Sequence, residues 1–274
     1  MTCPSPSIIN AEARGELDLA RLHVYRFLSL ALSDPATERY RRLADRRVQD
    51  AALAAAEYVR DEPSAYPASC ARGELPPSSL NFARLLSLLN DEPEACAAQY
   101  RAIFGLMISK ACPPYETEYT RQTFAVSRSH ALADVAAFYR AFGLKPSSDL
   151  PERCDHVSLE LELMAWLIAK ERHALEQGEQ DDAAVCREAQ VSFVREHLAW
   201  WLPAFTHALR RQADGVASAE SSQTGAVTFY AAVATVLAAF ISAERAILGI
   251  APPEEFAVRE AVSADGDGEP GPQR

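Results

Sequence analysis

The chain has 274 residues, of which 49% are hydrophobic and 24% charged, so it can bury an ordinary globular core, and disorder is excluded for most of its length. Its 27 Lys and Arg against 38 Asp and Glu give a formal net charge of -11, which argues against nucleic acid as a partner. An acidic surface favours a positively charged partner, although it is also common among proteins that are simply soluble.

The first predicted element is an amphipathic helix over residues 17–32, which follows a flexible N-terminus of residues 1–15. Apolar residues recur there at spacings of three and four, and Asp34-Pro35 ends the helix. The N-terminus lacks the basic segment and apolar run of a secretory signal. We therefore expect a cytoplasmic protein.

Short helices and loops are predicted to alternate through the next part of the chain. Helix continues over residues 36–60, and the Pro, Ser and Gly content of residues 61–78 indicates a long connection. Ser79 resembles a cap for a helix over residues 81–90. Another helix follows over residues 93–104, with Pro in its first turn.

The second half is predicted to contain the longest helices. A loop over residues 107–118 is kept non-helical by two adjacent prolines, and a helix follows over residues 129–143. After a loop over residues 144–154, the helix over residues 155–176 is apolar on more than one stripe. It should therefore be central to the fold.

The C-terminal part is predicted to form two further helices and a tail. A helix over residues 181–211 is bent or split at Pro203, and residues 212–223 form a polar loop. The last helix covers residues 224–248, and the acidic, Gly/Pro-rich residues 251–274 are expected to be disordered.

One stretch, residues 221–243, carries no charge and is long enough to span a bilayer. Its Ala-rich core with Thr and Ser, and its acidic flanks, favour a buried helix instead, and we expect no membrane span. The chain shows neither sustained period-two alternation nor an internal repeat. The predicted fold is all-α, a single bundle of about ten helices over residues 16–250, present as a monomer or homodimer.

No phosphate-binding Gly loop, nucleophile elbow or zinc-protease helix occurs in the sequence, which weighs against catalysis. The cysteines form no C-x-x-C pair and are expected to be reduced thiols. They are Cys3, Cys70, Cys96, Cys112, Cys154 and Cys186.

Two segments nevertheless concentrate unusual residues, 112–119 (CPPYETEY) and 153–156 (RCDH), the second followed by Glu160 and Glu162. Asp155 stands where a helix N-cap is needed. Tyrosines such as those of the first segment are more often core or loop-anchoring aromatics than ligand contacts.

His156 and Glu160 are four residues apart on one helical face, so they could pair, bind a metal together, or present a donor and a carboxylate to a peptide. Two ligands do not make a metal site, and no metal is expected. An enzyme that uses Asp155, His156 and Glu160 for metal or acid-base chemistry remains the alternative, and a structural subunit of a complex is a third possibility.

The order of these segments resembles the TorD/DmsD/NarJ family of chaperones for molybdoenzymes, over nearly the whole folded chain. The matching stretches are Arg21, Tyr25 and Leu28 of the first helix, residues 100–105 (YRAIFG), 113–119 (PPYETEY), 138–144 (FYRAFGL) and 155–164 (DHVSLELELM). The Cys-Pro-Pro-Tyr-Glu form is most similar to the subgroup that serves periplasmic selenate reductase, dimethyl sulfide dehydrogenase and ethylbenzene dehydrogenase. Cys154 stands where the family often has Pro, and Leu163 where it has Phe.

The resemblance implies a helical chaperone, not an enzyme. Such a chaperone binds the twin-arginine signal peptide of a catalytic subunit of the dimethyl sulfoxide reductase type. It holds the subunit until the molybdenum cofactor is inserted and before Tat export. The client carries the molybdopterin cofactor, and the chaperone holds none stably.

The resemblance also implies a peptide-binding groove near six residues: Tyr115, Glu116, Tyr119, Asp155, His156 and Glu160. Among them, Asp155 and Glu116 are our predicted contacts for the arginines of the peptide, because paired carboxylate and guanidinium groups form two parallel hydrogen bonds.

Overall fold

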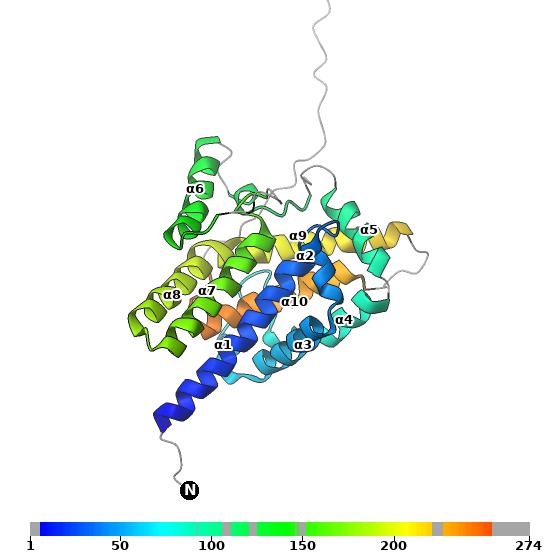
Figure 1. Ribbon diagram of the computed structural model, residues 1–274. Coiled ribbons are helices and arrows are strands. Elements are labelled where there is room, and N and C mark those ends of the chain that lie inside the picture. Colours follow the sequence, from blue (N-terminus) through cyan, green and yellow to red (C-terminus); the bar gives the residue numbers. More distant parts are fainter. Residues whose placement is uncertain are drawn as a thin grey trace, which may run out of the picture.

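The computed structural model describes residues 6–91, 93–105, 111–120, 125–145, 147, 152–220 and 227–253. Their α-helices are α1 (Pro6–Ala31), α2 (Glu38–Arg41), α3 (Arg46–Asp61), α4 (Phe82–Asp91), α5 (Pro93–Phe104), α6 (Ala125–Ala141), α7 (Val157–Gln177), α8 (Gln180–Phe193), α9 (Ala199–Glu220) and α10 (Phe229–Ile247) (Figure 1). The described residues contain no strand, only one isolated β-bridge, so the predicted all-α class is confirmed.

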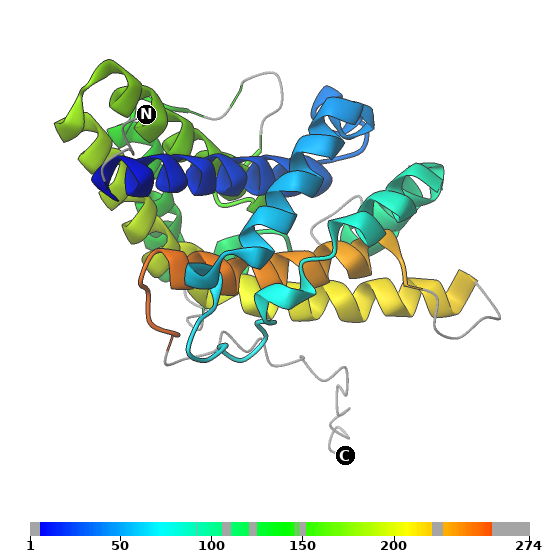
Figure 2. The ribbon, with the colours of Figure 1, turned by 90° about the horizontal axis from the view of Figure 1, so that it is seen from below.

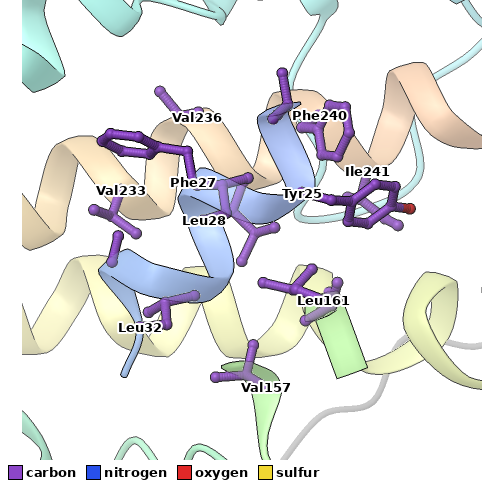
Figure 3. Close-up of a cluster of buried hydrophobic side chains, with 14 of the residues drawn as sticks. Tyr25, Phe27, Leu28, Leu32, Val157, Leu161, Val233, Val236, Phe240 and Ile241 are labelled. Atoms are coloured by element: carbon purple, nitrogen blue, oxygen red, sulfur yellow. The ribbon is translucent and has the colours of Figure 1, made fainter. Parts of the chain in front are cut away.

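The centre of the bundle is α10, which lies along α9 on one side and meets α1 on the other (Figure 2). In the core, Tyr25, Phe27 and Leu28 of α1, with Leu32 just after it, pack between two groups of buried side chains (Figure 3). One group is Val233, Val236, Phe240 and Ile241 of α10, and the other is Val157 and Leu161 of α7. Burial of these apolar side chains stabilises the bundle.

Among the described residues, α10 is the helix whose length and hydropathy would suit a bilayer, and 83% of its apolar window is buried inside the protein. The prediction of a buried helix in this stretch is confirmed. The helix begins at Phe229, later than the predicted residue 224, because the Thr228 hydroxyl oxygen accepts a hydrogen bond from the Ala231 N–H (3.3 Å) and caps it.

A buried ion pair fixes α1 against α10. The Arg21 guanidinium donates from Nε to Glu244 Oε1 (2.8 Å) and from Nη2 to Glu244 Oε2 (3.0 Å). Asp18 accepts a third hydrogen bond from Arg21 (2.6 Å), and the Tyr25 hydroxyl donates to Glu244 (3.0 Å). All four side chains are buried, so the polar groups of the pair are satisfied within the protein.

The first helix begins at Pro6, well before the predicted residue 17, and so includes part of the N-terminus that we expected to be flexible. The part of the helix around Gly15 is held to α7, because Arg172 donates a hydrogen bond to the Gly15 carbonyl oxygen and Arg14 lies 3.9 Å from Glu171. Residues 1–5 lie outside the described part of the chain, as do residues 254–274, where the expected disorder stays a prediction.

Two other predicted boundaries are wrong. Helix α9 continues to Glu220 through most of the predicted polar loop at residues 212–223, whose last three residues are outside the described ranges. Buried Ala213 packs in the core and extends the helix. Ser79 is not the cap of α4, because it lies in a 3₁₀ turn, and Asn81 Oδ1 instead accepts the hydrogen bond of the Arg84 N–H (3.0 Å).

The long helix predicted over residues 181–211 is split, but not at Pro203. A π-helical turn, η5 (Val194–Leu198), separates α8 from α9, and Pro203 lies inside α9. The turn carries His197, whose ring meets a buried carboxylate of the candidate site. The π-helical turn therefore coincides with a polar contact inside the core.

Candidate functional site

A single antiparallel bridge joins the two segments that the sequence singles out. Tyr115 pairs with His156, and the Glu116 N–H donates to the Asp155 carbonyl oxygen (3.0 Å). Segment 112–119 therefore lies directly beside the start of α7. Five of the six predicted site residues come from these two segments, and the sixth, Glu160, follows in the first turn of α7, so the bridge brings them into one region.

Asp155 is fully buried and binds groups of its own chain. Its Oδ1 accepts from Arg153 Nε (3.0 Å), and its Oδ2 accepts from Arg153 Nη2 (2.7 Å) and the Thr117 hydroxyl (2.8 Å). The prediction that Asp155 caps α7 is wrong. The cap is the next residue, His156, whose backbone has the extended conformation of an N-cap residue.

His156 is buried and neutral. Its Nδ1 accepts the Ser158 N–H (3.2 Å), so its proton resides on Nε2. Burial lowers the pKa of His156 to about 3, because the buried ring loses hydration of its charged form; Asp155 partly opposes this shift, whereas Arg39 and Arg153 add to it. The imidazole therefore acts as a capping acceptor and not as a cation.

Glu160 and Glu116 form a buried carboxyl pair. Glu160 Oε2 accepts from the Trp201 indole N–H (3.0 Å), and the Glu116 oxygens lie 3.0 and 3.1 Å from His197 Nδ1. Burial, followed by the charge of Glu116, raises the pKa of Glu160 well above its ordinary value. Glu160 therefore keeps its proton at pH values where an exposed glutamate has lost its own.

The two tyrosines differ in exposure. The half-buried Tyr115 donates its hydroxyl proton to Glu152 Oε1 (2.9 Å), and the Arg153 guanidinium lies over its ring, 4.5 Å from the centroid. Tyr119 is buried and packs its ring against Trp201 at 5.3 Å between centroids. Tyr115 can contact a ligand at the surface, whereas Tyr119 is buried and packs against Trp201 beneath the carboxyl pair.

A pocket of about 530 Å³ opens beside this cluster, where α1 and α6 end and α7 begins. Three carboxylates line it, Asp34, Glu152 and Glu162, and Glu162 accepts a hydrogen bond from Arg39 (2.6 Å). Its apolar lining is Leu144, Leu159, Leu163 and Trp166. His156 belongs to the lining, whereas the more deeply buried carboxyl groups of Glu116, Asp155 and Glu160 do not.

Sequence patterns missed part of this region. His197 and Trp201 come from η5 and α9, far along the chain from the carboxyl groups that they contact, and no local pattern identifies them. The spacing of His156 and Glu160 suggested a possible pair, but each side chain contacts a different partner. Within the described residues, no three His, Cys, Asp or Glu side chains gather as a potential metal site.

Comparisons with known proteins identify the class. The family described as "Nitrate reductase delta subunit" matches residues 76–207. The "Selenate reductase assembly chaperone protein" of Thauera selenatis is 32% identical over 161 residues, which cover 59% of this chain and 74% of that protein. The "Chlorate reductase assembly chaperone protein" of Ideonella dechloratans is 38% identical over 82 residues, 30% of this chain and 42% of that protein.

The "Chaperone protein TorD" of Photobacterium profundum is 23% identical over 168 residues, 61% of this chain and 70% of that protein. No solved structure matches the chain significantly. These relatives define a class of reductase assembly chaperones. The chain belongs to the TorD/DmsD/NarJ family of molybdoenzyme assembly chaperones, and the selenate reductase relative confirms the predicted subgroup. Membership of this family decides for a chaperone and against the enzyme alternative.

Proposed function

We propose that this chaperone binds the twin-arginine signal peptide of a molybdopterin-containing catalytic subunit in the cytoplasm. It holds the subunit until the cofactor is inserted and so delays export. The client, not the chaperone, carries the cofactor, and the chaperone acts as a monomer or homodimer.

The observation that carries the proposal is the pocket beside the bridge. A twin-arginine signal presents two guanidinium groups followed by an apolar segment, so its receptor needs carboxylates next to an apolar wall. Asp34, Glu152 and Glu162 supply the carboxylates, and side chains such as Leu159 and Trp166 supply the wall. The overall charge of -11 also favours a cationic peptide.

The six predicted residues have distinct parts in this proposal. Tyr115 and His156 lie at the border between the buried cluster and the pocket. Glu116, Tyr119 and Glu160 hold that border in place through His197 and Trp201, so Glu116 contacts an arginine only if it leaves His197. Asp155 remains our proposed arginine contact.

The test begins with a pull-down from the source cells and mass spectrometry, followed by titration of the recovered client's N-terminal peptide. We expect a molybdopterin subunit whose Arg-Arg peptide binds and is released after maturation. Constitutive association with a mature complex would instead indicate a structural subunit.

Replacing both Asp155 and His156 by Ala should weaken peptide binding at least tenfold, about 1.4 kcal/mol. Exposed Arg84 on α4, changed to Ala, is the control and should bind as the unchanged protein does. The helical circular dichroism spectrum establishes that the double variant is folded. Unchanged affinity in a folded double variant would refute the site.

A further inference from the structure

Arg153 occupies a complete binding site for a guanidinium group. Two of its nitrogens bind the two oxygens of Asp155 at 3.0 and 2.7 Å, and Nη2 also donates to the Thr117 hydroxyl (2.6 Å). The ring of Tyr115 covers one face of the guanidinium at 4.5 Å. In-plane hydrogen bonds and a stacked aromatic face are the contacts by which proteins recognise arginine in general.

The receptor half of this site is buried, whereas its occupant is partly exposed. The Asp155 side chain is 0% exposed and Thr117 is buried, whereas the Arg153 side chain is 36% exposed. Both residues lie in the non-helical segment before α7, where the Asp155 carbonyl oxygen accepts from the Glu116 N–H and the Arg153 carbonyl oxygen accepts from the His156 N–H. The site is also continuous with the pocket, because Tyr115 is bonded to Glu152 and Glu152 lines the pocket.

We propose that Arg153 is an internal occupant that an arginine of the client displaces. The client guanidinium takes the place of Arg153 on Asp155, Thr117 and Tyr115, and Arg153 moves into solvent. This inference rests on the proposed function and adds to it the exchange and the roles of Thr117 and Tyr115.

The exchange fits the electrostatics of a buried carboxylate. Asp155 without a cation would be costly, since a buried charge that loses its partner destabilises a protein strongly. Replacing one guanidinium by another keeps the charge compensated throughout. A lysine cannot donate two hydrogen bonds in the same fork, so the site selects arginine over lysine.

The exchange and a purely structural ion pair predict opposite results for Arg153→Gln. If Arg153 competes with the client, its removal strengthens binding of a synthetic Arg-Arg peptide with an apolar segment, by roughly tenfold, about 1.4 kcal/mol. If the pair only holds the loop in place, binding is unchanged or weaker. Arg84→Gln removes the same charge from the exposed face of α4 and should leave the affinity unchanged.

A second measurement follows the exchange in the unchanged protein, and a folded variant serves only to assign the signal. The Nε–H signal of Arg153 in ¹⁵N NMR is identified by its absence from Arg153→Gln, or from Arg153→Lys if the first variant does not fold. The Arg-Arg peptide should shift this signal to the position of a solvent-exposed arginine, and the matched Lys-Lys peptide should not.

The outcomes separate the two proposals. If the unchanged protein does not bind the Arg-Arg peptide, the proposed function fails, and the exchange with it. If the peptide binds while the Arg153 signal keeps its position and removal of Arg153 gives no gain in affinity, the exchange alone is overturned.

Discussion

Two ion pairs of similar length should differ several-fold in the stability lost when one partner is removed. Arg21 and Glu244 lie 2.8 Å apart with both side chains 0% exposed, whereas Arg39 and Glu162 lie 2.6 Å apart with Glu162 55% exposed. We change each glutamate to Gln, which keeps the shape and removes the charge. Glu244→Gln leaves a buried guanidinium with Asp18 as its nearest carboxylate.

Breaking a buried pair costs about 3–5 kcal/mol, and the remaining contact to Asp18 places our expectation at the lower end, about 3 kcal/mol. For Glu162→Gln we expect about 0–1 kcal/mol, because water solvates the charges of an exposed pair.

Urea unfolding followed by circular dichroism gives both free energies of unfolding, provided that the dependence on urea concentration is the same in all three proteins. A loss below about 1 kcal/mol for Glu244→Gln would refute the reasoning from burial. A larger loss for Glu162→Gln than for Glu244→Gln would do so as well.

Two pH effects follow from the buried titratable groups. The pKa of Glu160 lies above its ordinary value of 4.5, so the folded state keeps a proton that the unfolded state loses, and this contribution to stability, complete below pH 4.5, is lost as the pH rises through the folded pKa. Glu160→Gln should therefore gain stability relative to the unchanged protein as the pH rises above 4.5, and parallel profiles of unfolding free energy would contradict this. His156 has the opposite sign, because its pKa falls from 6.5 to about 3: its contribution is complete above pH 6.5 and decreases on acidification. At pH 5 the loss amounts to about 2 kcal/mol, and His156→Asn, which keeps a capping oxygen, should be free of it in the same denaturation series.

The helices that the sequence predicts well are those with a strong apolar period. The segments that form α1, α7 and α10 have many apolar side chains at helical spacing, and their burial decides the structure. Residues 212–220 have a polar composition that is typical of loops, yet they continue α9, and within them Ala213 is buried in the core while Val216 packs against it. Local composition does not contain that tertiary contact.

The candidate site shows the same limit. The sequence places Tyr115, Glu116, Asp155 and His156 in two motifs, and the resemblance to a family predicts that the motifs act together. The sequence does not show that Asp155 binds Arg153 while His156 caps α7. This depends on whether the helix begins one residue earlier or later, which the local pattern does not decide. Contacts such as Glu116 with His197 join residues 81 positions apart, and such pairs have no local periodicity.

The π-helical turn η5 sets how the buried positions of α9 are rotated relative to those of α8. Before it, the buried positions of α8 are Ala183, Cys186, Gln190 and Phe193; after it, one buried stripe consists of Leu198, Leu202, Phe205, Leu209 and Ala213. Buried His197, Trp201 and Ala204 continue the first stripe, and the second stripe lies one residue, about 100°, further around the helix. Deleting any residue of the turn would close it into an ordinary helix. The deletion would also rotate either the core stripe or Trp201 away from its partners. An insertion or deletion there consequently changes the register of every buried position that follows, whereas a substitution changes one side chain.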